Sequence, residues 1–395
     1  MPPVTGGVEA VLGHHARLLR ARGWDVRLIA GRGDAELVPE VDSRHPDVER
    51  LAWALPRGEF DAGLFDRLRG ALRAHLLPLL ADRDVVVAHN VLTMPFNLPL
   101  ASVLAEAPAP VVAWTHDVAW VNPRYADYRR PGSPYDLLHR PGPGVTYVAI
   151  SAVRRRELAG VFGVPAEAVA VVPNGIDALA FWGISTATRA LAVRAGLLDG
   201  RPLVLVPVRL TRRKRLELAV EAVARLRGRY PQIRVAVTGP LGPHDPANRA
   251  YADELAALRS RLGLEDAVSF LYELAGAGRP HPVPDAMLAE LYRLADVVLL
   301  PSESEGFGLP VLEAALSRAP LVATDLEVLR EVSGGGLFTF AADAGPEAVA
   351  AAVEEALASP HTRLRSRVLA RHDWPAVASM LERVLDQAIE EARAR

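Results

Sequence analysis

The C-terminal half of the chain alternates short apolar runs with segments of helical periodicity, and this alternation restricts the fold more than any other feature. The apolar, β-branched runs lie at 202–208, 233–239, 267–271, 296–302 and 319–325. Between them, apolar residues recur at helical spacing in 216–228, 248–263, 284–295 and 310–318. Strands that alternate with helices are typical of a doubly wound parallel sheet, which binds ligands beyond the carboxyl ends of its strands.

The N-terminal half shows a weaker version of the same pattern. Strands are expected at 25–31, 84–90, 111–117, 144–151 and 168–175, and a helix at 8–24. No strand is evident in 176–201, which we interpret as a linker, and the chain closes on an amphipathic helix. A chain of 395 residues exceeds one ordinary core, so we expect two α/β domains, at 1–180 and 196–373, with helix 374–395 completing the first.

Composition excludes several classes of protein. The chain has no cysteine, which removes disulfides, thiolate nucleophiles and cysteine-bound zinc. A net charge of −2 gives no overall basic field for nucleic acid. No apolar run reaches the roughly 18 residues of a membrane span, and the first residues do not resemble a signal peptide. We therefore expect a cytoplasmic protein, with peripheral docking on a membrane surface left open.

Lysine usage singles out one basic segment. Lys214 is the only lysine among 45 Lys and Arg residues, and it lies in VRLTRRKR, 208–215, directly after an expected strand. Phosphates bind where exposed helix amides meet cationic side chains; Arg209 offers a planar fork and Lys214 a compact ammonium. The simpler interpretation is a solvated basic turn in a protein from a GC-rich genome, but codon bias does not explain why a lysine remains here.

A glycine turn at a second strand end carries two carboxylates. In SESEGFGLPVLEAALSRAPLVATD, 302–325, Gly306 and Gly308 lie between Glu305 and Glu313 and allow the backbone to approach a ligand closely. Glu305 and the loop amides suit a polyol such as a sugar, and Glu313 suits a diol such as a ribose. A helix start with an acid favoured by the helix dipole would explain Glu313 alone.

The histidines give weaker signals. His89 and His116 end two expected strands, and His116 is either a group with a direct role or simply a hydrogen-bonded histidine at a strand end. His14 and His15 are expected on a helix surface. No carboxylate cluster near these histidines completes a metal site. We therefore expect no metal.

Taken together, these motifs resemble the family 4 retaining glycosyltransferases, which have the GT-B fold. ESEGFGLPVLE matches the family's pair of glutamates separated by seven residues, and the resemblance covers nearly the whole chain. The other matching segments are PPVTGGVE at the start, WTHD (114–117), VVPNGID (171–177), VRLTRRK, VAVTGP (235–240) and the closing helix.

The resemblance implies a fold and a set of roles. The fold would be two Rossmann-like doubly wound domains facing a cleft, with the C-terminal helix crossing back to the N-terminal domain. Arg209 and Lys214 would bind the donor diphosphate and Glu313 the ribose. The remaining implied positions are Glu305 with the backbone of Gly306, Phe307, Gly308 and Leu309 on the donor sugar, Gly239 on the donor side, Gly7 near the phosphates or acceptor, and His116 at the reacting sugar.

The sequence departs from the family pattern in three places. Members carry a strand before the first glycine turn, whereas only five residues precede Gly6. Either the first strand is absent or the start codon lies upstream, and we expect the second. Val208 stands where a glycine commonly precedes the arginine of the phosphate motif. The segment 273–285 is longer than usual and is expected to shape the nucleotide or acceptor side.

The expected activity is metal-independent, retaining transfer of a hexose from a nucleotide diphosphate sugar to an acceptor hydroxyl, without a further cofactor. By the resemblance, the acceptor attacks from the front face and the departing phosphate takes its proton. Two alternatives remain: an epimerase or phosphorylase on the same fold, or a nucleotide-sugar-binding subunit without turnover. The sequence does not identify the donor base (UDP, GDP or ADP), the hexose, or the acceptor, which is a small molecule, a glycan or a lipid-linked group.

Overall fold

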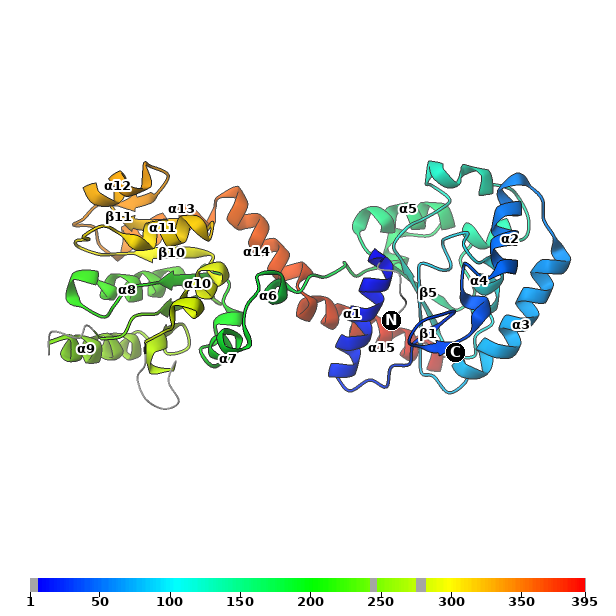
Figure 1. Cartoon of the computed structure of the whole chain (residues 1–395), viewed down its shortest axis with the longest axis horizontal. Coiled ribbons are helices and arrows are strands. Elements are labelled where there is room, and N and C mark those ends of the chain that lie inside the picture. The colour runs from blue at the N-terminus through cyan, green and yellow to red at the C-terminus, as the bar shows by residue number, and fades with distance from the viewer. Residues whose placement is uncertain (1–5, 242–246, 275–281, 395) are drawn as a thin grey trace. The chain divides into compact units, whose positions relative to one another are not determined.

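The computed structural model describes residues 6–241, 247–274 and 282–394, which form two compact units (Figure 1). The first unit contains residues 1–176 and 371–395, and the second contains 177–370. Each unit is built on a parallel sheet covered by helices. None of the described helices is long and apolar enough to cross a membrane.

The first unit is built on a four-stranded sheet in the order β3-β4-β5-β6, with every pair parallel. Its strands are β3 (Val86–His89), β4 (Val111–Thr115), β5 (Val145–Ala149) and β6 (Ala170–Val171). Its helices are α1 (Gly7–Ala21), α2 (Pro46–Ala54), α3 (Ala62–Leu80), α4 (Leu98–Leu104), α5 (Ala152–Phe162) and α15 (Trp374–Arg393).

Both faces of this sheet are covered, which explains the apolar strands. Along β4, Val111 and Ala113 belong to one apolar cluster, whereas Val112 and Trp114 belong to another that includes α1 and α15. Successive side chains of a strand point to opposite faces, so the near-continuous apolar run marks a strand buried on both sides. The closing helix α15 lies along α1 in the first unit, as the sequence predicts (Figure 1).

The strand predicted at 25–31 is largely wrong. Only Ile29 and Ala30 form a strand, β1, and it pairs with β2 (Glu36–Leu37) in a separate two-stranded sheet. Residues 25–28 are not buried, and they include charged Asp25 and Arg27. A central strand of a parallel sheet needs apolar side chains on both faces, which this segment does not supply.

The second unit contains six parallel strands in the order β12-β11-β10-β7-β8-β9. They are β7 (Leu203–Val206), β8 (Arg234–Val237), β9 (Val268–Phe270), β10 (Val297–Leu300), β11 (Leu321–Thr324) and β12 (Phe338–Phe340). The helices are α6 (Ala178–Phe181), α7 (Thr186–Arg194), α8 (Leu216–Leu226), α9 (Ala247–Arg261), α10 (Asp285–Leu294), α11 (Leu309–Leu316), α12 (Glu327–Ser333), α13 (Pro346–Leu357) and α14 (Pro360–His372).

This order is the Rossmann arrangement, with the chain reversing direction across the sheet between β7 and β10. The two strands are hydrogen-bonded neighbours, with Val204 opposite Val297 and Leu205 opposite Val298. Ligands of such sheets bind beyond the carboxyl ends of the strands at this reversal. The prediction of Rossmann-like parallel sheets, with the closing helix returned to the first unit, is confirmed.

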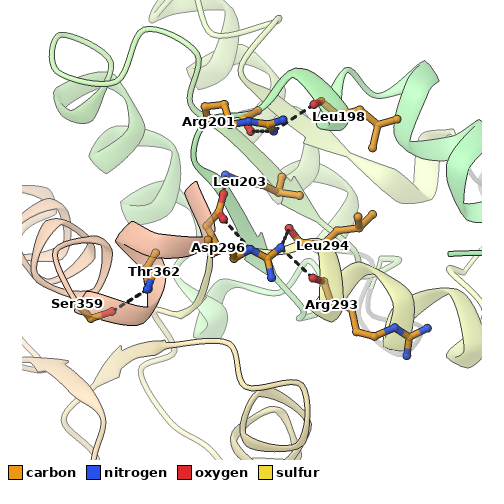
Figure 2. Close-up of polar contacts among 10 residues, drawn as sticks. Leu198, Arg201, Leu203, Arg293, Leu294, Asp296, Ser359 and Thr362 are labelled. Carbon is orange, nitrogen blue, oxygen red and sulfur yellow. Dashed lines mark hydrogen bonds and ion pairs between the residues drawn. The ribbon is translucent and has the colours of Figure 1, made fainter. Parts of the chain in front are cut away.

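A buried ion pair ties β7 to β10 at the amino ends of the strands, opposite the end where ligands bind. Figure 2 shows Asp296 beside Leu203: its carboxylate accepts from the Leu203 amide at 2.9 Å. The same carboxylate accepts from Arg365 Nε at 3.0 Å, and Arg365 also donates to the carbonyls of Arg293 (2.9 Å) and Leu294 (2.6 Å). These bonds fix α14 and the start of both central strands.

The linker predicted at 176–201 is not a separate linker, because residues 177–201 belong to the second unit. Leu191 and Ala192 of α7 are buried in that unit's core. The Glu290 carboxylate of α10 accepts from both the amide and the hydroxyl of Ser185, each at 2.8 Å. Amphipathic helices without a strand therefore extend the domain here.

Candidate functional site

Two loops follow the central strands β7 and β10 at the reversal of the second sheet. After β7, the chain passes Arg209 and forms a 3₁₀ turn, Arg212–Lys214. After β10, it forms the loop 301–308, which leads into α11. Since β7 and β10 are neighbours, their loops leave the same edge of the sheet side by side. The sequence predicts a phosphate-binding function for the first loop and a sugar-binding function for the second.

Three polar contacts join the two loops. The Glu303 amide donates to the Arg213 carbonyl at 2.8 Å, and Arg213 Nη1 donates to the Ser304 carbonyl at 3.1 Å. The third contact is an ion pair between the Lys214 ammonium and the Glu305 carboxylate. The two residues assigned to diphosphate and sugar therefore touch each other.

This ion pair is largely shielded from water. The side chain of Lys214 is 10% exposed and that of Glu305 is 8% exposed. Charges that are removed from water interact more strongly than surface pairs, and each needs the other because an unpaired buried charge is costly. A solvated basic turn does not fit Lys214, although its neighbours Arg212 and Arg213 are exposed.

The backbone takes an unusual conformation directly after Lys214. The next residue, Arg215, has φ of 47° and begins α8 from a left-handed conformation. The Leu216 amide at the first turn of α8 donates to Tyr251 Oη at 2.8 Å, and Tyr251 is itself buried. A non-glycine residue held at positive φ stores strain that surrounding contacts must offset.

Arg209 differs from Lys214 in its surroundings. It is exposed, and among the described residues no carboxylate lies within ion-pair distance of it. Gly239, after β8, packs directly against this segment: a Cβ at that position would lie 2.1 Å from the Val208 carbonyl oxygen and 2.4 Å from Arg209 Cα. Only glycine allows these two loops to approach this closely, which accounts structurally for the predicted Gly239.

The glycine turn has one crowded and one open glycine. Gly308 has φ of 90°, and a Cβ there would lie 2.4 Å from Leu329 Cδ2. A Cβ on Gly306 would meet no heavy atom within 4 Å. Phe307 and Leu309 are 53% and 62% exposed. Gly308 is therefore needed by the fold, whereas the fold itself places no demand on Gly306.

Glu313 lies one turn into α11, as predicted, and has a partner that the motif did not indicate. Tyr292 Oη donates to Glu313 Oε2 at 2.5 Å. Burial raises the pKa of the Tyr292 phenol, and the hydrogen bond to Glu313 and its negative charge raise it further. The phenol therefore remains protonated and donates to the carboxylate. The tyrosine lies at helical spacing in α10, where it is indistinguishable by sequence from an ordinary core residue.

His116 and Gly7 belong to the first unit. His116 follows β4 and is buried; its Nε2 lies 3.4 Å from His89 Nδ1. Burial lowers the pKa of His116, while the charges of Asp117 and Glu9 raise it. Gly7 opens α1, and a Cβ there would meet no atom within 4 Å.

The prediction that His15 lies on a helix surface is wrong. His15 is 3% exposed, and neither ring nitrogen has a hydrogen-bond partner among the described residues. Its ring packs edge-on against Trp114 at 4.6 Å and Trp374 at 5.8 Å between centroids. Helix α15 covers this side of α1, which sequence spacing within α1 does not reveal. Burial lowers the pKa of His15 to about 4, with smaller effects from His116 and His14.

Two further predictions concern a metal site and the extended segment 273–285. In the described residues no three His, Cys, Asp or Glu side chains are grouped so that they could hold a metal ion. The extended segment 273–285 lies mostly outside the described residues, because 275–281 are not among them.

Comparison with protein families gives two matches that together span nearly the whole chain. Residues 5–178 match the family described as Glycosyltransferase Family 4, and residues 190–372 match Glycosyl transferases group 1. The division between the two matches lies close to the division between the two units.

Individual proteins show the same similarity. A D-inositol 3-phosphate glycosyltransferase of Frankia alni is 30% identical over 91% of this chain and 88% of that protein. A protein of the same name from Kineococcus radiotolerans is 32% identical, but the aligned region spans 62% of this chain and only 58% of that protein. Among solved structures, Anabaena Alr3699/HepE in complex with UDP and glucose aligns over 98% of both chains at 18% identity, with a TM-score of 0.38.

Proposed function

The chain belongs to the family 4, group 1 glycosyltransferases, and we propose that it moves a hexose from a nucleotide diphosphate sugar to an acceptor hydroxyl with retention at the anomeric carbon. The observation that carries the proposal is the Lys214–Glu305 pair at the reversal of the Rossmann sheet. It presents a cation for the diphosphate beside a carboxylate for the sugar, at the edge where this fold binds ligands.

Transfer requires that the protein stabilise the negative charge that develops on the leaving diphosphate while the anomeric C–O bond breaks. In our proposal Arg209 and Lys214 supply that stabilisation through charge-assisted hydrogen bonds, without a metal ion. Glu305 and the amides of the glycine turn orient the sugar. Lys214 turns from Glu305 toward the diphosphate, or contacts both, when the donor is bound.

The remaining predicted residues take supporting roles. Glu313 accepts from the ribose, and His116 of the first unit acts at the reacting sugar. The attack is proposed at the front face, with the departing phosphate oxygen taking the acceptor's proton. In that step the C–O bond between the anomeric carbon and the diphosphate breaks, and a C–O bond to the acceptor oxygen forms. The proton passes from the acceptor hydroxyl to the departing phosphate.

Donor identity is tested by thermal unfolding with UDP-, GDP- and ADP-sugars. A ligand present at 100 times its Kd adds about 2.7 kcal/mol to stability, which is readily seen as a shift of the unfolding curve. Turnover is then measured with D-inositol 3-phosphate as the first acceptor, because the similar proteins carry that name. Free sugar or sugar phosphate formed without an acceptor would indicate an epimerase or phosphorylase, and donor binding without turnover would indicate a binding subunit.

A further inference from the structure

Tyr292 lies in the core of the second unit, and its hydroxyl makes one hydrogen bond, to Glu313. It occupies the last turn of α10 and is 1% exposed. Its ring belongs to the same apolar cluster as the strands of the Rossmann sheet. A tyrosine hydroxyl that is buried needs a hydrogen-bond partner, and here that partner is the Glu313 carboxylate of the neighbouring helix α11, at 2.5 Å.

The bond has a defined direction. A carboxylate offers only acceptors, and a phenol whose charged form is disfavoured by burial and by the adjacent negative charge retains its proton. Tyr292 therefore donates to Oε2 of Glu313 across the working pH range. Because the ring is fixed in the core, this donor holds one carboxylate oxygen at a set position.

The opposite side of the carboxylate remains available. A carboxylate has about four lone-pair positions on two oxygens, and Tyr292 uses one of them. Glu313 is half-buried, and the described residues supply no other hydrogen bond to its side chain. The acceptor capacity that is left over suits a group with two adjacent O–H donors.

We propose that Tyr292 is a positioning residue that orients the Glu313 carboxylate so that it accepts from the vicinal hydroxyls of the donor's ribose. This inference rests on the proposed function and deepens it, because it assigns recognition of a ribonucleotide to a pair of side chains. A carboxylate that is already held in place loses less freedom when the nucleotide binds, and affinity rises accordingly.

The test pairs removal of the phenol oxygen with removal of the ribose hydroxyls. Isothermal titration calorimetry measures Kd for UDP, GDP and ADP and for their 2′,3′-dideoxy counterparts, on the full chain and on Tyr292→Phe. With the ribonucleotide that binds wild type, Tyr292→Phe should weaken binding by up to about tenfold, because the nucleotide must then immobilise a Glu313 side chain that is no longer held in place. With the dideoxy nucleotide, wild type and Tyr292→Phe should bind equally.

Two further variants separate positioning from general loosening of the core. Tyr147→Phe removes a buried tyrosine hydroxyl in the first unit and should leave both Kd values unchanged. Glu313→Gln should weaken ribonucleotide binding, and adding Tyr292→Phe to it should produce little further loss. If Tyr292→Phe alone lowers the melting temperature, the comparison of Glu313→Gln with the double variant still tests whether Tyr292 acts through Glu313.

Each other outcome overturns the proposal. Equal losses for ribo- and dideoxynucleotides would make Tyr292 a purely structural residue, and an unchanged Kd would show that Glu313 needs no positioning. If wild type binds ribo- and dideoxynucleotides equally, the ribose hydroxyls do not contribute to binding and Tyr292 has no role in recognising them. The glycosyltransferase proposal would not be affected by that result. If none of the three ribonucleotides binds wild type, the proposed function itself fails.

Discussion

Lys214 and Glu305, which lie 91 residues apart in the chain, form an ion pair whose side chains are both about nine-tenths buried. The pair joins the loops that follow the two central strands of the Rossmann sheet. It also means that the cation assigned to the diphosphate is neutralised when no donor is bound. In our proposal, a diphosphate that arrives at this edge therefore replaces or shares an existing partner of Lys214 and does not meet a free charge.

The first prediction concerns the stability of this pair. Lys214→Ala should destabilise the protein by about 3 kcal/mol, because it leaves the Glu305 carboxylate buried without a partner. Glu305→Ala should cost a similar amount, and the double variant should cost less than the sum by about 2 kcal/mol. The measurement is urea unfolding of the four proteins.

A neighbouring arginine provides the control. Arg212 lies in the same turn, but its pair with Glu254 is exposed. Arg212→Ala should therefore change stability by less than about 1 kcal/mol. Additive losses for Lys214 and Glu305 would show that the pair contributes no coupling and that the contact is incidental.

A second prediction separates the two glutamates by their kinetics. Glu305→Gln should lower kcat strongly, because the residue contacts Lys214 and, in our proposal, the reacting sugar. Glu313→Gln should chiefly raise the KM for the donor, because the ribose is remote from the bond that breaks. Steady-state kinetics with varied donor measure both parameters, and equal losses of kcat would contradict the assignment.

The two glycines at 239 and 306 should respond differently to the same change. Gly239→Ala should destabilise the protein by about 2 kcal/mol or more, because the added Cβ would lie 2.1 Å from the Val208 carbonyl oxygen. Gly306→Ala has open space and should leave the melting temperature nearly unchanged. If the space beside Gly306 receives the donor, its alanine variant should nevertheless bind the donor more weakly; unchanged binding would mean that the ligand lies elsewhere.

Removal of Arg365 tests the buried ion pair at the other end of the strands. Arg365→Ala leaves Asp296 without its ionic partner, and Asp296 is 2% exposed. We expect a loss of about 3 kcal/mol in urea unfolding. Arg225→Ala, which breaks the exposed pair with Glu347, should cost less than about 0.5 kcal/mol. If both variants lose similarly small amounts of unfolding free energy, the buried Arg365–Asp296 pair contributes little to stability.

The buried histidine of the first unit predicts a dependence of stability on pH. The pKa of His15 falls from an ordinary 6.5 to about 4 in the folded protein, chiefly through burial. The folded state then binds fewer protons than the unfolded state between these values, so stability is complete above pH about 6.5 and falls as the pH drops toward 4. Integrated over that window, the loss is about 3 kcal/mol.

A variant without this titrating group supplies the comparison. His15→Gln should unfold with a flatter dependence on pH between 4 and 6.5 in denaturant titrations. The stability of His15→Gln should still depend on pH to some extent, because the pKa of His89 is also lowered by burial and by the charges of His15 and His116. An identical slope in wild type and His15→Gln would mean that His15 does not contribute to the linkage.

The sequence by itself determined the parts of this protein that depend on local pattern. Apolar runs that alternate with helical periodicity predicted the parallel strands. The close approaches of Gly239 to Val208 and of Gly308 to Leu329 were not predicted, because the sequence suggested these glycines only as contacts of a ligand. The solitary Lys214 and the spaced glutamates predicted where polar groups gather. Short β12 is not evident from the alternation, because three residues after a run of glycines give too little pattern.

Tertiary structure alone decided which of these groups touch. Spacing along the chain does not show that Lys214 meets Glu305, that Tyr292 of α10 meets Glu313 of α11, or that α15 buries His15. Each contact joins elements whose neighbourhood follows from strand order and helix packing. Single-residue burial and partner choice are long-range properties, whereas periodicity and glycine placement are local ones. For that reason the sequence predicted which loops carry the candidate site, and only the folded structure identified the contacts between those loops.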